Sequence, residues 1–238
     1  GQPVIDPDTG DDALSVDDAL ASGMWAPLDA RDGPAMLVTS NVTDSDHILT
    51  DKSIAIQKSV AVVVDTGVEG VSPGDTVEYT LNFQISDYFA FQNITIPADV
   101  LGDGARFLWT FTPTLWVMEN GVTLGPVPFA TQHYTVTPNY TPDSPPPNDG
   151  TTTISFDISG QLATSGRSGQ MLGGLVADGG SSNDGPTMGQ IKFRAVIQEQ
   201  YSDDYPSGDP YLNENDSVTN AVTIRGDLLD VTTCSTGT

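Results

Sequence analysis

The 238-residue chain is almost free of cysteine, and Cys234 near the C-terminus is its single one. No disulfide can form within the chain, so an extracellular form would need another source of stability. Basic residues are also scarce: 8 Lys and Arg stand against 32 Asp and Glu, and the net charge is −24. A surface this acidic is repelled by nucleic acid and by anionic membranes, so neither is an expected partner.

Long apolar runs and catalytic motifs are missing as well. No apolar stretch is long enough to cross a bilayer, so we expect no direct membrane insertion. The two histidines, His47 and His133, have no nucleophile motif nearby. Metalloprotease, serine-hydrolase and phosphate-loop patterns are also absent from the sequence. The chain is therefore not expected to be an enzyme that turns over a substrate.

Alternating strands separated by Gly- and Pro-containing turns are what the sequence does contain. The clearest lies in residues 71–107, VSPGDTVEYTLNFQISDYFAFQNITIPADVLGDGARF, where apolar and polar residues alternate strictly from 76 to 85. Such a period of two is typical of a strand with one buried face. Further strands are expected at 53–64, 106–118, 122–136, 152–158, 190–200 and 217–224. We predict an all-β, antiparallel, Ig-like β-sandwich with long loops and an extended N-terminal segment.

Three details of this layout can be tested. The Asn120-Gly121 pair is a strong hairpin signal between two strands. Trp109 and Trp116 fall within a strand that we expect to pack in the core, which leaves Trp25 as the better candidate for exposure. The Gly- and Ser-rich residues 160–189 are expected to form a long surface excursion.

The N-terminal residues 1–52 are acidic and resemble a linker or an inter-module or inter-subunit strand segment. Asp6, Asp8 and Asp12 gather around Gly10 in a loose likeness to a calcium loop. The glycine does not stand where an EF-hand needs it, so a solvated acidic surface is the alternative. Residues 43–53 (TDSDHILTDKS) indicate a polar linker.

One polar residue interrupts the apolar face of both the first and the last strand of the main domain. Lys58 shares its face with Ile54, Ile56, Val60, Val62 and Val64. Asn220 shares its face with Val218, Val222 and Ile224. Burying an ammonium group is costly unless it is paired or loses its proton. The alternatives are that Lys58 snorkels at a strand edge and that Asn220 satisfies a backbone group.

A buried lysine beside a buried asparagine can react. A lysine that burial has deprotonated is a nucleophile, and a carboxamide becomes an electrophile when an acid polarises its carbonyl group. The product is a Lys58–Asn220 isopeptide bond, with loss of ammonia. Asp99 is the first choice for the acid, because Pro97 can introduce a bulge that turns Asp99 inward. Asp157 and Glu78 are the alternatives, although their strand positions place both on the wet face.

The segments PGDTVEYTL, NITIPADVLGDG, GQIKFRAVI and VTNAVTI follow the first-strand lysine in order. This arrangement resembles the isopeptide-forming fimbrial and adhesin domains of bacterial surface proteins, of the collagen-adhesin-type and DUF11-like β-sandwich class. The resemblance implies cross-linking by Lys58 and Asn220 with help from Asp99. It further implies a sandwich at residues 53–226, a preceding junction at 1–52 and a C-terminal linker at 227–238.

The sequence therefore favours a structural module of an extracellular filament, fimbria, pilus or long adhesin at the cell surface. Its partners would be neighbouring copies or modules of the same surface protein, and no cofactor would be required. The alternative is an adhesin module that binds carbohydrate or a surface and depends on calcium. In that case glycans would be the partners and calcium the cofactor, with Asp6, Asp8 and Asp12 as candidate ligands.

Overall fold

The structure is a computed structural model of the chain. It describes residues 54–67, 70–86, 89–139, 150–177, 187–202, 208–213 and 216–229, and the strand backbones at 4–5, 13–21, 24–25, 38–39 and 43–51. The chain divides into two compact units, residues 1–52 and residues 53–238. Each is described by itself.

The N-terminal unit is built from strands. These are β1 (Val4–Ile5), β2 (Ala13–Ala21), β3 (Met24–Trp25), β4 (Val38–Thr39) and β5 (Thr43–Asp51). β2 and β5 form a regular antiparallel ladder from the pair Ala13–Asp51 to the pair Ala21–Thr43. The expected polar linker at 43–53 is thus wrong for most of its length, because ladder hydrogen bonds join backbone groups and do not require apolar side chains. Asp6, Asp8 and Asp12 lie outside the described residues.

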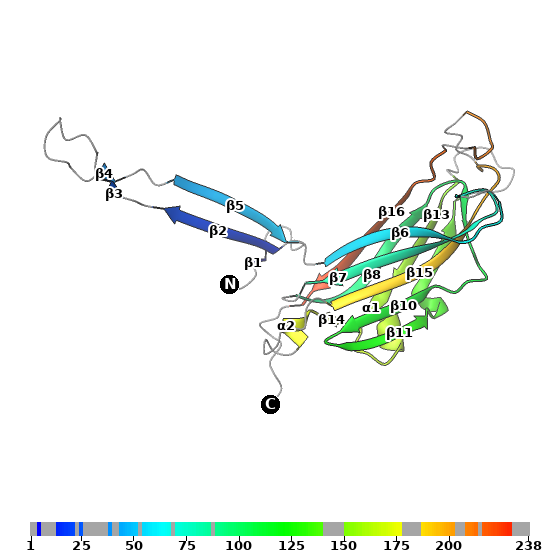
Figure 1. The fold of residues 1–238 in the computed structure, drawn as a ribbon. Coiled ribbons are helices and arrows are strands. Elements are labelled where there is room, and N and C mark those ends of the chain that lie inside the picture. The colour runs from blue at the N-terminus through cyan, green and yellow to red at the C-terminus, as the bar shows by residue number, and fades with distance from the viewer. Residues whose placement is uncertain are drawn as a thin grey trace, which may run out of the picture. The chain divides into compact units, whose positions relative to one another are not determined.

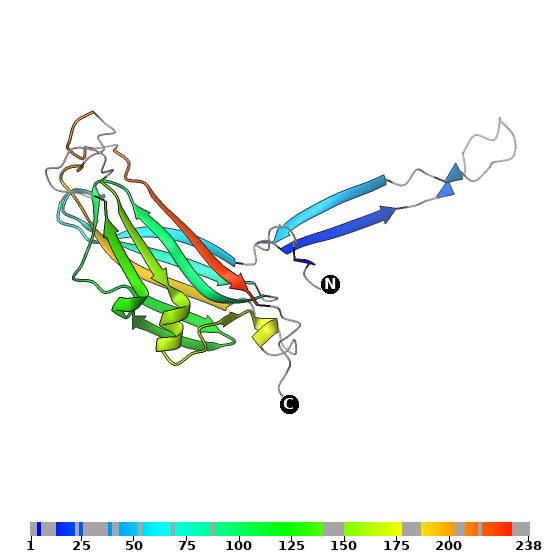
Figure 2. The same cartoon turned by 180° about the vertical axis from the view of Figure 1, so that it is seen from behind.

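The second unit contains two antiparallel sheets packed face to face (Figures 1 and 2). The first sheet has the order β11-β10-β15-β7-β6, and β9 also pairs with β15. Its strands are β6 (Ile54–Val64), β7 (Thr76–Ile85), β9 (Ala105–Phe107), β10 (Thr114–Glu119), β11 (Val122–Pro128) and β15 (Thr187–Ile197). β6 ends this order, so it is an edge strand.

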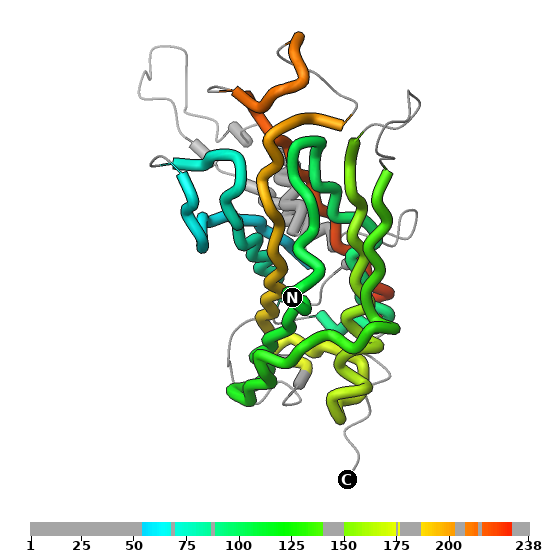
Figure 3. Tube along the Cα trace, turned by 90° about the vertical axis from the view of Figure 1, so that its right-hand side faces the viewer, coloured from blue at the N-terminus to red at the C-terminus, as the bar shows by residue number. Residues whose placement is uncertain are grey.

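The second sheet has the order β12-β13-β8-β14, and β16 also pairs with β8. Its strands are β8 (Ala90–Leu101), β12 (Tyr134–Pro138), β13 (Thr152–Asp157), β14 (Met171–Leu172) and β16 (Asn220–Leu228). Figure 3 shows the sandwich from one side, with β15 in gold on the left and β12 and β13 in green on the right. The predicted all-β antiparallel sandwich is confirmed.

The core follows from the alternation in β7. Val77, Tyr79, Leu81, Phe83 and Ile85 are all buried, as their period of two predicted. Aromatic rings connect the two sheets: Phe193 of β15 stacks on Tyr79 with centroids 5.1 Å apart, and it also contacts Phe156 of β13 at 6.0 Å. The hairpin predicted at Asn120-Gly121 is present, with positive φ at both residues.

The segment expected to be a long surface excursion contains regular structure. It holds most of α1 (Ile158–Thr164) and all of β14 and α2 (Gly174–Ala177). Asp157 caps α1 by accepting a hydrogen bond from the backbone N–H of Gly160, and Ile158 and Leu162, four residues apart, are buried. The expectation was wrong because these two apolar residues form one helical turn inside a Gly- and Ser-rich context. Within the described part of the chain, no helix combines the length and hydropathy of a membrane span.

Two expectations about core packing are also wrong. The predicted strand at 106–118 is divided into β9 and β10, and Trp109 lies in the turn between them with 63% of its surface exposed. Trp116 does lie in a strand, but it alternates with the buried Leu115 and Val117 and so belongs to the outer face. Val60 of β6 is 57% exposed, because β6 has a neighbour on only one side. Val64 is 48% exposed, because a register shift after Val62 pairs it with Thr76 on the outer face.

Candidate functional site

Lys58 lies midway along β6, where its backbone pairs with Leu81 of β7. The edge strand β6 lies beside β16 of the opposite sheet, which Figures 1 and 2 show from the two sides. A side chain that points inward from β6 therefore meets the edge formed by β16 and β8. This is the place where the first and last strands of the sandwich come together.

A bulge in β8 turns Asp99 toward this edge. Against β13, Ile96 pairs with Phe156 but Asp99 pairs with Ile154, so β8 contains one extra residue there. The pairing of β8 with β16 shows the same shift. The bulge predicted at Pro97 is therefore present, and it changes which residues of β8 face inward. Beyond it, the Asp99 carboxylate is fully buried.

The ammonium group of Lys58 contacts this carboxylate. Its Nζ atom lies 2.5 Å from Oδ1 and 2.7 Å from Oδ2 of Asp99, and the two side chains are 11% and 0% exposed. The same Nζ lies 4.5 Å from the centroid of the Tyr79 ring and 5.2 Å from that of Phe193. Lys58 thus occupies an aromatic pocket with one anionic partner.

Asn220 is the first residue of β16, opposite Leu101 of β8 and two residues from Val222, which pairs with Asp99. Its carboxamide nitrogen and oxygen are buried and have no hydrogen-bond partner of normal geometry among the described residues. The carboxamide nevertheless lies close enough to Asp99 and Tyr79 to act on the pKa of both groups. Buried polar atoms without partners are rare, so this pair of atoms needs an explanation.

Burial drives both members of the ion pair toward their neutral forms. Desolvation lowers the pKa of Lys58 from its ordinary 10.5 to about 8, although the charge and hydrogen bonds of Asp99 oppose this change. Desolvation also raises the pKa of Asp99, against the opposing effects of Lys58 and Asn220. A neutral amine beside a protonated carboxyl group is therefore an accessible state of this pair.

In that state the three side chains hold the groups needed for an acyl transfer. Lys58 provides a nitrogen lone pair, Asn220 provides a carbonyl carbon, and Asp99 provides a proton donor next to both. Asp99 can also accept the proton that the lysine nitrogen loses. The low exposure of the site keeps water from competing with the amine.

The two alternative acids lie elsewhere. Glu78 accepts hydrogen bonds from Lys192 at 2.9 Å and from Arg194 at 3.0 Å on the outer face of the first sheet. Asp157 caps α1 and lies 3.1 Å from His133 Nδ1. Neither contact involves Lys58, so the structure brings Lys58 together with Asp99 alone among the three candidates.

Tyr79 and Phe193 are site residues that the sequence reasoning did not name. Both were placed on the buried faces of their strands, but nothing in the sequence indicated that they would surround Lys58. The signal lies in the register: Tyr79 pairs with Val60 on one side and with Phe193 on the other. Once the order β15-β7-β6 is known, Lys58 falls diagonally next to Tyr79.

The predicted calcium ligands cannot be located, because Asp6, Asp8 and Asp12 lie outside the described residues. Within the parts of the chain that the structure describes, no group of three or more His, Cys, Asp or Glu side chains is arranged to hold a metal ion.

Comparisons with known proteins leave the chain without a family. No family model matches it, and no curated protein matches it. Among solved structures, it resembles the full-length pilus protein RrgB of Streptococcus pneumoniae at 13% identity and a TM-score of 0.27, covering 82% of this chain and 26% of that one. A variant of BcpA, the major pilin subunit of Bacillus cereus, matches at 11% identity and a TM-score of 0.29, covering 88% and 47%.

The collagen-binding domain of the surface protein RspB of Erysipelothrix rhusiopathiae matches at 12% identity and a TM-score of 0.27, covering 90% of this chain and 60% of that one. The chain thus spans less than two thirds of each of these three proteins. All three are pilin or adhesin surface proteins. At these TM-scores the likenesses carry no argument about function, which has to come from the site.

Proposed function

We propose that the sandwich is a self-cross-linking structural module of an extracellular filament, fimbria or long adhesin. Lys58 and Asn220 form an isopeptide bond with Asp99 as the assisting acid. The observation that supports this proposal best is the buried contact of Lys58 Nζ with Asp99 Oδ1 at 2.5 Å, next to the buried Asn220 carboxamide, which interacts with the same Asp99 carboxyl group. A site of this kind is costly for folding alone, and a reaction explains why it is kept.

The reaction balances without any further reagent. The Asp99 carboxyl group hydrogen-bonds to Oδ1 of Asn220 while the neutral Nζ of Lys58 attacks Cγ. Nζ then gives up a proton through Asp99, and Nδ2 takes up a proton and leaves as ammonia. One Cγ–Nδ2 bond is broken, one Nζ–Cγ bond is formed, and Asp99 is regenerated. Because the bond forms once, the protein is no enzyme in the turnover sense.

The position of the cross-link suggests its purpose. It would join β6, the first strand of the sandwich, to β16, the last one. A pulling force that enters at one end of the module and leaves at the other would then pass through the covalent bond and bypass the strands between. This suits a module that links neighbouring copies or modules at a cell surface, in a chain that cannot form an internal disulfide.

Intact mass of the folded protein tests the proposal. The wild type should weigh less than its sequence by one ammonia, and the Lys58→Ala and Asp99→Asn variants should show the full sequence mass. Lys192→Ala is the matched control, because Lys192 pairs with Glu78 outside the site and should keep the deficit. Proteolysis should release one branched peptide that contains Lys58 and Asn220. A wild-type mass equal to the sequence would rule out the bond.

A further inference from the structure

The outer face of the first sheet carries a row of uncharged polar side chains that ends at a tryptophan. Gln57 of β6 pairs with Asn82 of β7, Asn82 pairs with Gln190 of β15, and Gln190 pairs with Trp116 of β10. The Gln190 amide donates a hydrogen bond of 2.9 Å to Asn82 Oδ1. Four strands thus present one continuous rung of amides and an indole on a single face.

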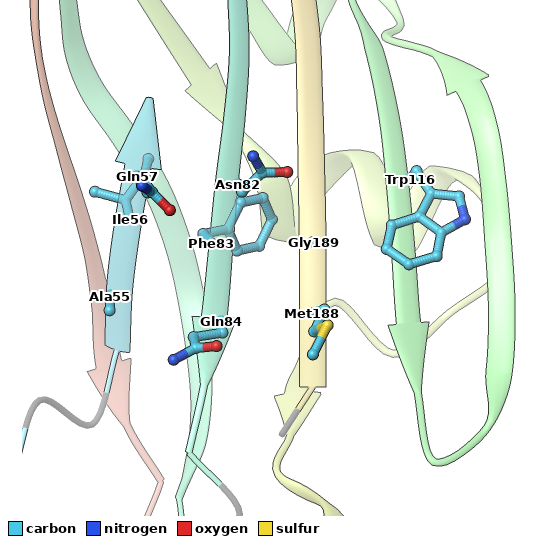
Figure 4. Close-up of a pocket in the computed structure, with 9 residues that line it drawn as sticks. All are labelled: Ala55, Ile56, Gln57, Asn82, Phe83, Gln84, Trp116, Met188 and Gly189. Carbon is cyan, nitrogen blue, oxygen red and sulfur yellow. The ribbon is translucent and has the colours of Figure 1, made fainter. Parts of the chain in front are cut away.

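The neighbouring row of cross-strand pairs, two residues further along the strands, completes a groove of about 380 Å³. It adds Ala55, Gln84 and Met188, which occupy consecutive strands on the same face. Figure 4 shows the amides on β6 and β7, Met188 on β15, and the Trp116 ring face-on beyond it. The indole therefore lies along the sheet and turns one face outward. Ile56, Phe83 and Gly189, which alternate with these residues along β6, β7 and β15, also line the groove.

The groove differs from the rest of the protein in charge. The chain carries a net charge of −24, yet none of the nine residues that line the groove is ionisable. The charged residues nearest to it along β15 and β7 are Lys192, Arg194 and Glu78, and both cations pair with the Glu78 carboxylate. A ligand that binds here therefore needs no charge of its own, and the net charge of −24 on the whole chain disfavours the approach of an anionic ligand.

We propose that this groove binds a neutral oligosaccharide. Amide side chains offer both donors and acceptors, as the hydroxyl groups of a sugar require. A flat, half-buried indole provides the apolar platform on which the C–H face of a pyranose ring stacks, and Met188 extends that platform. No calcium is needed, because the groove has no carboxylate. Lys58 points to the inner face of the sheet, so none of the residues that line the groove takes part in the cross-link.

Isothermal titration calorimetry of the full chain tests the proposal. The probes are neutral hexasaccharides (cellohexaose, laminarihexaose, maltohexaose and mannohexaose), with an anionic hyaluronan hexasaccharide and a Gln- and Asn-rich hexapeptide as comparisons. We expect at least one neutral probe to bind at millimolar concentration or below, unchanged by a calcium chelator. The Trp116→Ala variant should weaken that binding by about tenfold or more.

Trp109→Ala is the matched control, because Trp109 is exposed but lies outside the groove. It should leave the affinity unchanged. Gln84→Leu is the second variant, because Gln84 is exposed, its replacement leaves the core intact, and it should also weaken binding. The proposal is overturned if no neutral probe binds, if the anionic probe or the peptide binds as tightly as the best sugar, or if Trp116→Ala and Trp109→Ala behave alike.

Discussion

The Asn220→Ala substitution measures how much the proposed cross-link stabilises the sandwich. It removes the electrophile but leaves the contact between Lys58 and Asp99 intact. A bond between positions 58 and 220 closes a loop of about 160 residues, and by the chain-entropy relation for a covalent link this stabilises the fold by about 5 kcal/mol.

Thermal and urea unfolding of the wild type and the Asn220→Ala variant provide the assay. For a domain of this size, a loss of about 5 kcal/mol lowers the Tm by about 10–20 °C. Lys58→Met should cause at least this loss, because it also leaves the buried Asp99 carboxyl group without its cationic partner. The double variant should lose little more than Lys58→Met, since that variant already lacks the bond. A difference below about 1 kcal/mol between wild type and Asn220→Ala would refute the reasoning, and so would additive losses in the double variant.

Two further predictions concern pH. Burial lowers the pKa of the free Lys58 amine to about 8, against an ordinary 10.5, and we expect the Asn220→Ala variant to keep this lowered pKa because the amine stays free and buried. Between these two values the unfolded chain binds more protons, so the stability of the variant should rise with pH there by up to about 3 kcal/mol. Urea midpoints at pH 8 and pH 10 should show the rise, and the Lys58→Met/Asn220→Ala variant should lack it. Hydrogen bonds from the backbone N–H groups of Thr66 and Ser72 lower the pKa of Asp75, so its contribution is present above the ordinary 3.8 and is lost as pH falls through the lower folded value. Asp75→Asn should therefore reduce stability at neutral pH, and the difference from wild type should shrink in acid; a constant difference would contradict this reasoning.

Much of the sandwich could be predicted, because burial on one face leaves a period of two in the sequence. This signal located β7, β13 and β15, and the aromatic residues at their apolar positions, Phe83, Phe156 and Phe193, are buried. It failed where burial depends on position within the sheet. Val60 has the inward parity of its strand but lies on an edge, and no local pattern distinguishes an edge strand from a central one.

The candidate site could be predicted from the sequence because its residues break the apolar pattern around them. Lys58 and Asn220 are polar residues at apolar positions, and Pro97 indicated the bulge that turns Asp99 inward. The groove could not be found in this way. Trp116 lies within the continuous apolar run 115–118, so the sequence alone does not show which face of the strand it occupies until the facing sheet is known.

Both proposals involve β6. Saccharide binding should depend on the cross-link, whereas the cross-link should not depend on the groove. Lys58 points inward from this edge strand, whereas its neighbour Gln57 belongs to the groove on the outer face. Without the cross-link, β6 is held by β7 alone in its sheet, and an edge strand opens more readily than a central one. Asn220→Ala should therefore weaken saccharide binding and speed amide hydrogen exchange in β6, whereas Trp116→Ala should leave the ammonia deficit in the intact mass unchanged. If Asn220→Ala speeds exchange in β6 without changing the affinity, the β6 side of the groove does not contribute to binding, and the ligand is held by β7, β15 and β10.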